Sequence, residues 1–109
     1  MGADDDASAR ARVAALLGSG MATDWEHRAY TSEDVARVAA HLRQVPRDDY
    51  QTRIQVAGFT SHSYHPAEDA DIEQACLTCM YFERNRRYCN LPEIALPVEP
   101  EWSCIMWRI

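Results

Sequence analysis

The stretch "ACLTCMYFERNRRYCNLPEIALPVEPEWSCIMWRI", residues 75–109, holds every cysteine in the chain. A Cys-x-x-Cys pair opens it, and two isolated cysteines follow. A segment this short does not bury a stable core alone, because domains below about 40 residues usually need a disulfide, a metal or a partner. A metal bound by these side chains would therefore stabilise the tail whatever its other role. The four cysteines are Cys76, Cys79, Cys89 and Cys104.

Charge and composition narrow the class of protein. The 109 residues carry a formal net charge of −6, which argues against a nucleic-acid partner because phosphate binding requires clustered basic residues. Residues 1–75 hold thirteen acids against seven arginines, whereas residues 76–109 hold four of each. The N-terminus does not resemble a secretory signal, and no apolar run reaches the length of a membrane span. We expect a cytoplasmic protein, and in that reducing compartment grouped cysteines bind metal more often than they form disulfides.

The pattern predicts a small, loop-rich, metal-stabilised α+β protein. Residues 1–50 form a helical N-terminal segment, and residues 51–109 form a cysteine-rich domain with short strands. One helix is expected over residues 7–17, where the sequence Gly18-Ser19-Gly20 ends it. A second begins after Thr31, a good N-cap, and stops before Pro46. Its buried stripe, with a partly buried His41 beside it, consists of Val35, Val38, Leu42 and Val45.

The middle of the chain is less regular. Residues 50–59, "YQTRIQVAGF", favour a short strand over a continued helix. Residues 60–74 read as a loop that leads into one helical turn before Cys76. His62 and His65 in this loop are expected to be exposed and not to bind metal, since four cysteines are available. A short hairpin fits the region after Cys79.

The cysteine spacing, C-x2-C-x9-C-x14-C, suits two kinds of metal site. Four thiolates can hold either a tetrahedral zinc ion or a cubane iron–sulfur cluster. Zinc ribbons usually take both halves of the site from Cys-x-x-Cys knuckles, so the isolated third and fourth cysteines favour a cluster. Half of the ten aromatic residues also lie near a cysteine, and a buried cluster needs a dry shell. These five are Tyr81, Phe82, Tyr88, Trp102 and Trp107.

The motif "CLTCMYF…CNLPEIALPVEPEWSCIMW" resembles the cluster-binding half of high-potential iron–sulfur proteins. That family has a Cys-x-x-Cys, then a cysteine that opens a Pro-containing loop, and a final cysteine flanked by tryptophans. The resemblance covers the last third of the chain and implies a [4Fe–4S] cluster ligated by Cys76, Cys79, Cys89 and Cys104. It implies a cluster shell that includes Tyr81, Tyr88, Trp102 and Trp107, and an upstream tyrosine, Tyr50 or Tyr64, on the cluster.

Two departures qualify the resemblance. The interval between Cys79 and Cys89 is shorter than in most soluble members, and Ser103 separates Trp102 from Cys104. The chain also lacks the export signal of the family's carriers. In these respects it is similar to the small iron–sulfur subunits of certain glycyl-radical enzymes.

The sequence therefore predicts an iron–sulfur protein with no catalytic activity of its own. It would transfer one electron, or stabilise or regulate a larger oxidoreductase or radical enzyme as a non-catalytic subunit. The expected partner is a larger subunit or a redox protein, and docking onto it could use the basic group Arg84, Arg86 and Arg87. The main alternative is a structural zinc module that binds another protein, and a disulfide-stabilised interaction domain is the third.

Overall fold

The computed structural model describes residues 3–64 and 73–108. Within these ranges the chain is a small α+β protein with three α-helices, one 3-10 turn and a two-stranded sheet. The helices are α1 (Ala3–Gly18), α2 (Ser32–Arg43) and α3 (Tyr50–Val56). The turn is η1 (Cys76–Thr78), and the strands are β1 (Phe82–Glu83) and β2 (Tyr88–Cys89).

The first two helices confirm the sequence expectation. Helix α1 ends at Gly18, one residue beyond the predicted end, and begins four residues earlier than expected. Helix α2 begins after Thr31, whose Oγ1 accepts a hydrogen bond from the Asp34 N–H at 3.0 Å. Its buried residues include Val38 and Leu42 of the predicted stripe, whereas Val35 and Val45 are half-buried. The prediction that His41 is partly buried is wrong, because its side chain is exposed.

Residues 50–59 were predicted to form a strand, and that prediction is wrong. Residues 50–56 form helix α3 because Asp49 caps it: its carboxylate accepts from the Thr52 N–H at 3.2 Å. The apparent alternation of apolar residues was misleading, since Ile54 and Val56 are both buried on a short helix. Gly58, at a φ of +63°, then turns the chain away from the helix.

The cysteine-rich part consists of turns and short pairings. The predicted helical turn exists, but it starts at Cys76 instead of preceding it, and residues 65–72 lie outside the described residues. The predicted hairpin is confirmed: β1 and β2 pair antiparallel, with Phe82 opposite Cys89. An isolated bridge joins Thr60 to Ser103 and so ties the segment after α3 to the C-terminal segment.

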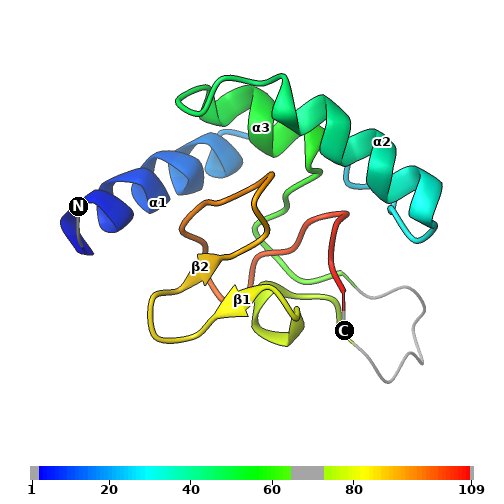
Figure 1. The fold of residues 1–109 in the computed structure, drawn as a ribbon. Coiled ribbons are helices and arrows are strands. Elements are labelled where there is room, and N and C mark those ends of the chain that lie inside the picture. The colour runs from blue at the N-terminus through cyan, green and yellow to red at the C-terminus, as the bar shows by residue number, and fades with distance from the viewer. Residues whose placement is uncertain (1–2, 65–72, 109) are drawn as a thin grey trace.

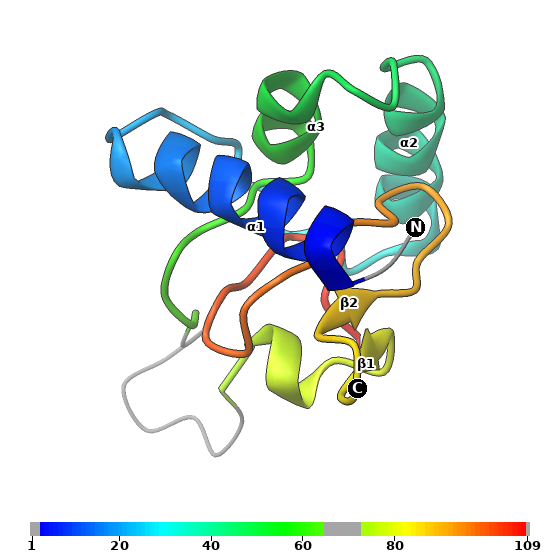
Figure 2. The ribbon, with the colours of Figure 1, turned by 90° about the vertical axis from the view of Figure 1, so that its left-hand side faces the viewer.

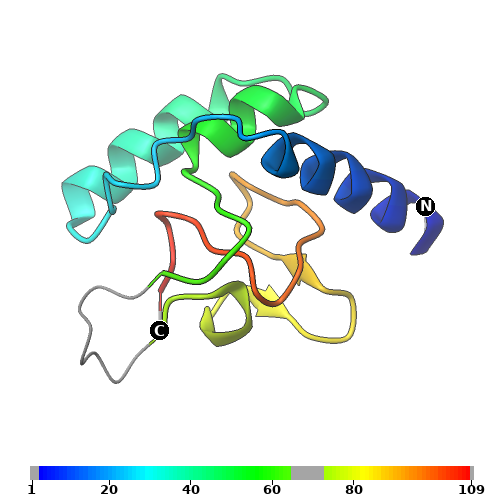
Figure 3. The same ribbon diagram turned by 180° about the vertical axis from the view of Figure 1, so that it is seen from behind.

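The helices and the cysteine-bearing segments occupy opposite sides of the molecule. Figure 1 shows the three helices in one layer, with α3 between α1 and α2, and the β1–β2 hairpin and C-terminal loops beneath them. The same division is visible from the side and from behind (Figures 2 and 3). A single cluster of buried residues joins the two, and it includes Val13 of α1, Leu42 of α2, Ile54 of α3 and Cys104. The core therefore runs across the boundary predicted at residue 50.

Candidate metal centre

All four cysteines line one apolar cavity. They come from η1, from the residue that follows it, from β2 and from the C-terminal segment. The cavity is small, with a volume of about 20 Å³, and is partly open to solvent. Three of the thiols are buried and Cys79 is half-buried, and none of the four is in a disulfide. The other lining residues are Phe59, Phe82, Val98 and Trp107.

Backbone hydrogen bonds fix the segments that carry the cysteines. The N–H of Cys76 donates to the Trp102 carbonyl at 2.6 Å, which holds η1 against the C-terminal segment. The N–H of Cys79 donates to the Cys76 carbonyl at 3.0 Å and closes the Cys-x-x-Cys turn. The N–H of Cys89 donates to the Leu96 carbonyl at 2.8 Å. Residues far apart in the sequence thus reach one cavity through local backbone pairing.

The C-terminal cysteine is held from both sides. The Ser103 and Thr60 backbones exchange two hydrogen bonds, at 2.9 and 3.1 Å, just before Cys104. Directly after it, the Ile105 N–H donates to the Ala57 carbonyl at 2.9 Å. The end of α3 and the segment beyond it therefore position Cys104.

The thiols are in a dry environment and close to one another. Burial raises the pKa of Cys76 well above its ordinary value, and the charges of Cys104, Cys89 and Cys79 raise it further. Burial is also the main cause that raises the pKa of Cys89 to about 12, and it raises that of Cys104 as well. Such thiols are protonated and inert at neutral pH unless a metal displaces their protons.

Two backbone N–H groups point at sulfur atoms in the cavity. The Leu91 N–H donates to the Cys89 sulfur, and the Met106 N–H donates to the Cys104 sulfur. Each of these hydrogen bonds lowers the pKa of its thiol against the larger effect of burial. Donors of this kind stabilise thiolates and, in iron–sulfur sites, influence the reduction potential.

The four thiols are more widely separated than the ligands of one bound ion. Among the described residues, no three His, Cys, Asp or Glu side chains are grouped as the ligands of a single metal. A zinc ion needs its sulfur ligands about 2.3 Å from one point. In the described chain the four thiols line one small cavity together with four apolar side chains.

The predicted aromatic shell is only partly at the cavity. Of its members Trp107 lines the cavity, and its indole N–H donates to the Thr78 hydroxyl at 3.0 Å. Trp102 is buried in the core, whereas Tyr81 and Tyr88 are half-buried and do not line the cavity. Phe82, one of the five aromatics noted near the cysteines, lines the cavity, and so do Phe59 and Val98, to which sequence reasoning assigned no role there.

The aromatic residue upstream of the cysteines that lines the cavity is Phe59. Neither Tyr50 nor Tyr64 lines the cavity, whereas the Phe59 side chain does and is 1% exposed. The ring of Tyr50 lies under the Arg12 guanidinium, and the Tyr64 ring lies under that of Arg28. The apolar run "VAGF" before Thr60 was the one signal in the sequence that Phe59 is buried. The assignment of this segment to a strand led us to overlook it.

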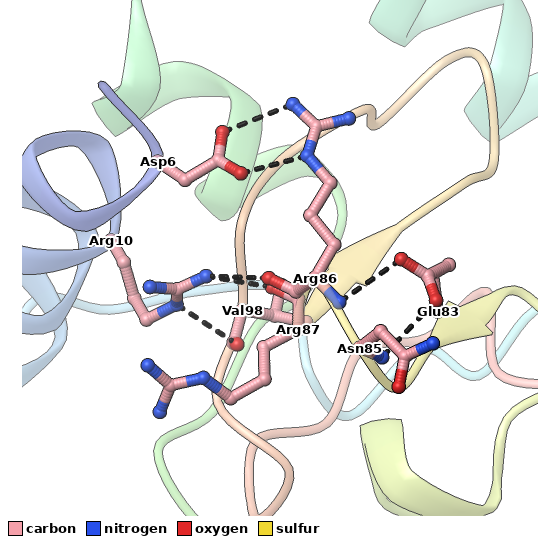
Figure 4. A network of polar contacts seen from close by, with 7 residues as sticks. All are labelled: Asp6, Arg10, Glu83, Asn85, Arg86, Arg87 and Val98. Carbon is pink, nitrogen blue, oxygen red and sulfur yellow. Dashed lines mark hydrogen bonds and ion pairs between the residues drawn. The ribbon is translucent and has the colours of Figure 1, made fainter. Parts of the chain in front are cut away.

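The proposed docking arginines lie at the turn between β1 and β2. Arg86 forms a two-bond ion pair with Asp6 of α1, at 2.7 and 3.0 Å (Figure 4). Arg87 pairs with Glu99 at 3.1 Å, and Arg84 is exposed. Two of the three are therefore already engaged inside the chain.

Helix α1 is attached to the same turn by a buried arginine. Arg10 is 8% exposed, and its guanidinium donates to the carbonyls of Arg86, Arg87 and Val98 at 2.9 to 3.1 Å. Figure 4 shows this side chain reaching from α1 to the backbone of the cysteine-rich part. The N-terminal helix thus covers that part of the chain directly.

Comparison with protein-family models, with curated proteins and with solved structures finds no match to this chain. The likeness to high-potential iron–sulfur proteins therefore stays a prediction from its motifs. Within residues 3–64 and 73–108, none of the helices has the length and apolar character that crossing a bilayer requires.

Proposed function

We propose that this chain binds one [4Fe–4S] cluster and serves as a small electron-transfer protein or as an iron–sulfur subunit of a larger enzyme. The observation that carries the proposal is the single apolar cavity lined by all four cysteines. Four thiols around a shared dry space suit a polynuclear cluster, whose irons take their ligands from separated loops. Its ligands would be Cys76, Cys79, Cys89 and Cys104.

The surroundings of the cavity supply what such a cofactor needs from a protein. Phe59, Phe82, Val98 and Trp107 give the cavity an apolar lining, and the N–H groups of Leu91 and Met106 donate to sulfur. When bound, the cluster would supply one-electron chemistry. The chain's own residues hold it, keep it dry and set its electrostatic environment. We propose no catalytic role for any residue of the chain.

An electron would leave through the edge of the site near Cys79. This cysteine is the one that is half-buried, and its neighbours Leu77 and Met80 are 46% and 63% exposed. Exposed apolar side chains beside the least buried ligand suit contact with a redox protein or a larger subunit. Helix α1 is occupied with its own cysteine-rich part, so we place the partner at this edge and not on α1.

Metal analysis of protein purified anaerobically tests the proposal. We expect brown protein with about four irons and four sulfides per chain, as one cubane requires. Colourless protein with one zinc per chain would refute it and support the structural zinc module instead.

Cysteine variants test the ligand set. Replacing Cys89 or Cys104 by alanine should abolish cluster binding and unfold the tail, because metal binding contributes folding free energy. Ser103→Ala is the matched control, since Ser103 adjoins Cys104, is 1% exposed, and its hydroxyl has no hydrogen-bond partner in the described chain. A Cys104→Ala protein with the same iron content as Ser103→Ala would exclude Cys104 as a ligand.

A further inference from the structure

A second, larger cavity lies between the connection from α2 to α3 and the loop that follows β2. This loop rises toward the helix layer (Figures 1 and 2). The cavity has a volume of about 620 Å³ and is partly open to solvent, and cavities of this size hold small organic ligands. None of the four cysteines lines it, so it is separate from the cysteine site. The lining residues are Leu42, Arg43, Gln44, Val45, Pro46, Arg47, Arg53, Pro92 and Glu93.

The lining of this cavity carries an excess of positive charge. It contains three arginines and one glutamate, and the Glu93 carboxylate is paired with Arg43 at 3.3 Å. Among the described residues neither Arg47 nor Arg53 forms an ion pair. The acidic residues 48–49 follow Arg47 in the chain but do not line the cavity. Two guanidinium groups of the cavity therefore have no counter-charge in the described chain.

Arg53 is the buried member of this pair. It lies on α3 and is 3% exposed. Its Nη1 donates to the Arg47 carbonyl at 3.0 Å, whereas its Nη2 is buried and has no hydrogen-bond partner among the described residues. A buried donor without an acceptor is costly, and more so when it is charged. The arrangement calls for an anionic acceptor in the cavity that Arg53 lines.

Arg47 is the exposed member of the pair. Its Nη2 donates to the Pro92 carbonyl at 3.1 Å, which is the one side-chain hydrogen bond that it forms within the described chain. Burial lowers the pKa of Arg53, and the charge of Arg47 lowers it further, so the two guanidinium groups are close enough to repel each other. An anion with two charges on one group would offset both, whereas a single carboxylate would offset one.

We propose that this cavity binds the dianionic phosphate group of a small organic molecule, with Arg47 and Arg53 as its donors. The fork of a guanidinium group matches two oxygens of a phosphate, and a phosphate monoester carries about 1.5 to 2 negative charges at pH 7. Gln44 adds an amide donor to the lining. The rest of the molecule would contact the apolar residues of the lining, which are Leu42, Val45, Pro46 and Pro92.

Calorimetric titration of the metal-loaded protein with phenyl phosphate tests the inference. Phenyl sulfate is the matched ligand, because it has the same ring and a similar tetrahedral group but one charge instead of two. We expect phenyl phosphate to bind about tenfold more tightly than phenyl sulfate, since a second guanidinium group contributes only to the dianion. Inorganic phosphate should bind more weakly than phenyl phosphate, because it has no ring to contact the apolar residues.

Arginine variants identify the donors. Arg47→Met and Arg53→Met should each weaken binding of phenyl phosphate by about tenfold or more, because each removes charge-assisted hydrogen bonds. Arg37→Met is the matched control: it removes the same charge from α2, where Arg37 is paired with Asp34 at 3.2 Å and does not line the cavity. Since Arg47 is exposed, its variant should keep the fold and decides the inference if Arg53→Met unfolds.

Three results would overturn the inference. Wild-type protein that gives no binding heat with phenyl phosphate contradicts the site itself. Equal affinities for phenyl phosphate and phenyl sulfate contradict the dianion, and an Arg47→Met protein that binds as well as Arg37→Met contradicts the donors. Equal affinities for inorganic and phenyl phosphate would overturn the choice of an organic ligand. The inference does not depend on which metal the cysteines hold, so failure of the proposed cluster leaves all of these comparisons unchanged.

Discussion

Gly58 offers a sharp test of how helix α3 is joined to the cysteine site. It has a φ of +63°, and a Cβ built on it would lie 2.5 Å from Ile105 Cγ2 and 2.9 Å from the Asp24 carbonyl oxygen. Gly20 provides the matched control. It also has a positive φ, of +81°, but a Cβ there meets nothing within 4 Å. Alanine at each position therefore shares the backbone strain, and only Gly58→Ala adds a clash.

The expected magnitudes follow from these two terms. A left-handed backbone costs an L-residue about 1–2 kcal/mol, and we expect Gly20→Ala to destabilise the protein by that amount. Overpacking adds about 1–3 kcal/mol, so Gly58→Ala should cost about 2–5 kcal/mol. Ile105 is 3% exposed and has little room to move away. Since domains are stable by about 5–15 kcal/mol, the variant should fold but with a clearly lower stability.

Urea unfolding of the metal-loaded wild type and both variants measures the difference. We expect a lower midpoint in Gly58→Ala than in Gly20→Ala, with an unchanged slope. Because Ile105 directly follows Cys104, we also expect Gly58→Ala to release its metal to a chelator faster than the control does. Equal midpoints for the two variants would refute the close packing of Gly58 against Ile105.

Three further perturbations test the contacts around the site. Arg10→Met removes hydrogen bonds to three carbonyls and should cost about 1.5–3 kcal/mol. Hydrogen exchange should show that α1 loses protection before α2, and uniform loss would contradict this. The Arg86 hydrogen bond lowers the pKa of Asp6 from 3.8, so the pair stabilises the fold above about pH 4 and loses that effect as the pH falls through the lowered value. Arg86→Gln should return the Asp6 pKa toward 3.8 by carboxyl NMR, and an unchanged pKa would disprove the pair. Phe59→Ala should cost about 3–5 kcal/mol in urea unfolding, and a loss below 1 kcal/mol would exclude Phe59 from the packed core.

Local signals in the sequence were enough to predict α1, α2 and the hairpin. Thr31 is an N-cap by its own chemistry, and Gly18-Ser19-Gly20 ends a helix without help from distant residues. The short interval between Cys79 and Cys89 leaves little room for anything but a tight turn, and β1 and β2 form there. These features depend on residues a few positions apart, and such features are readable from a single sequence.

The prediction for residues 50–59 failed because tertiary contacts decide whether this segment forms a helix or a strand. Seven residues are too few for a period to separate helix from strand, and burial of Arg53 beside Ile54 is not visible in a hydrophobic pattern. The wrong assignment also hid Phe59 as a cavity residue. In the same way, no local rule places Arg28 near Cys104, because the two residues meet only through the fold.

The structure also explains why a small chain would devote three helices to a cysteine-rich tail. The backbone at Ala57 and Thr60 forms hydrogen bonds with the residues on either side of Cys104. Arg10 of α1 donates hydrogen bonds to three carbonyls of the cysteine-rich part. Any metal that orders the four cysteines would therefore also order the segment after α3 and the surface on which α1 lies. In turn, Phe59, just after α3, lines the cavity, and the backbone at Ala57 and Thr60 positions Cys104, which the tail alone has no means to do. The helix layer and the cysteine site depend on one another, and we expect them to form and to be lost together.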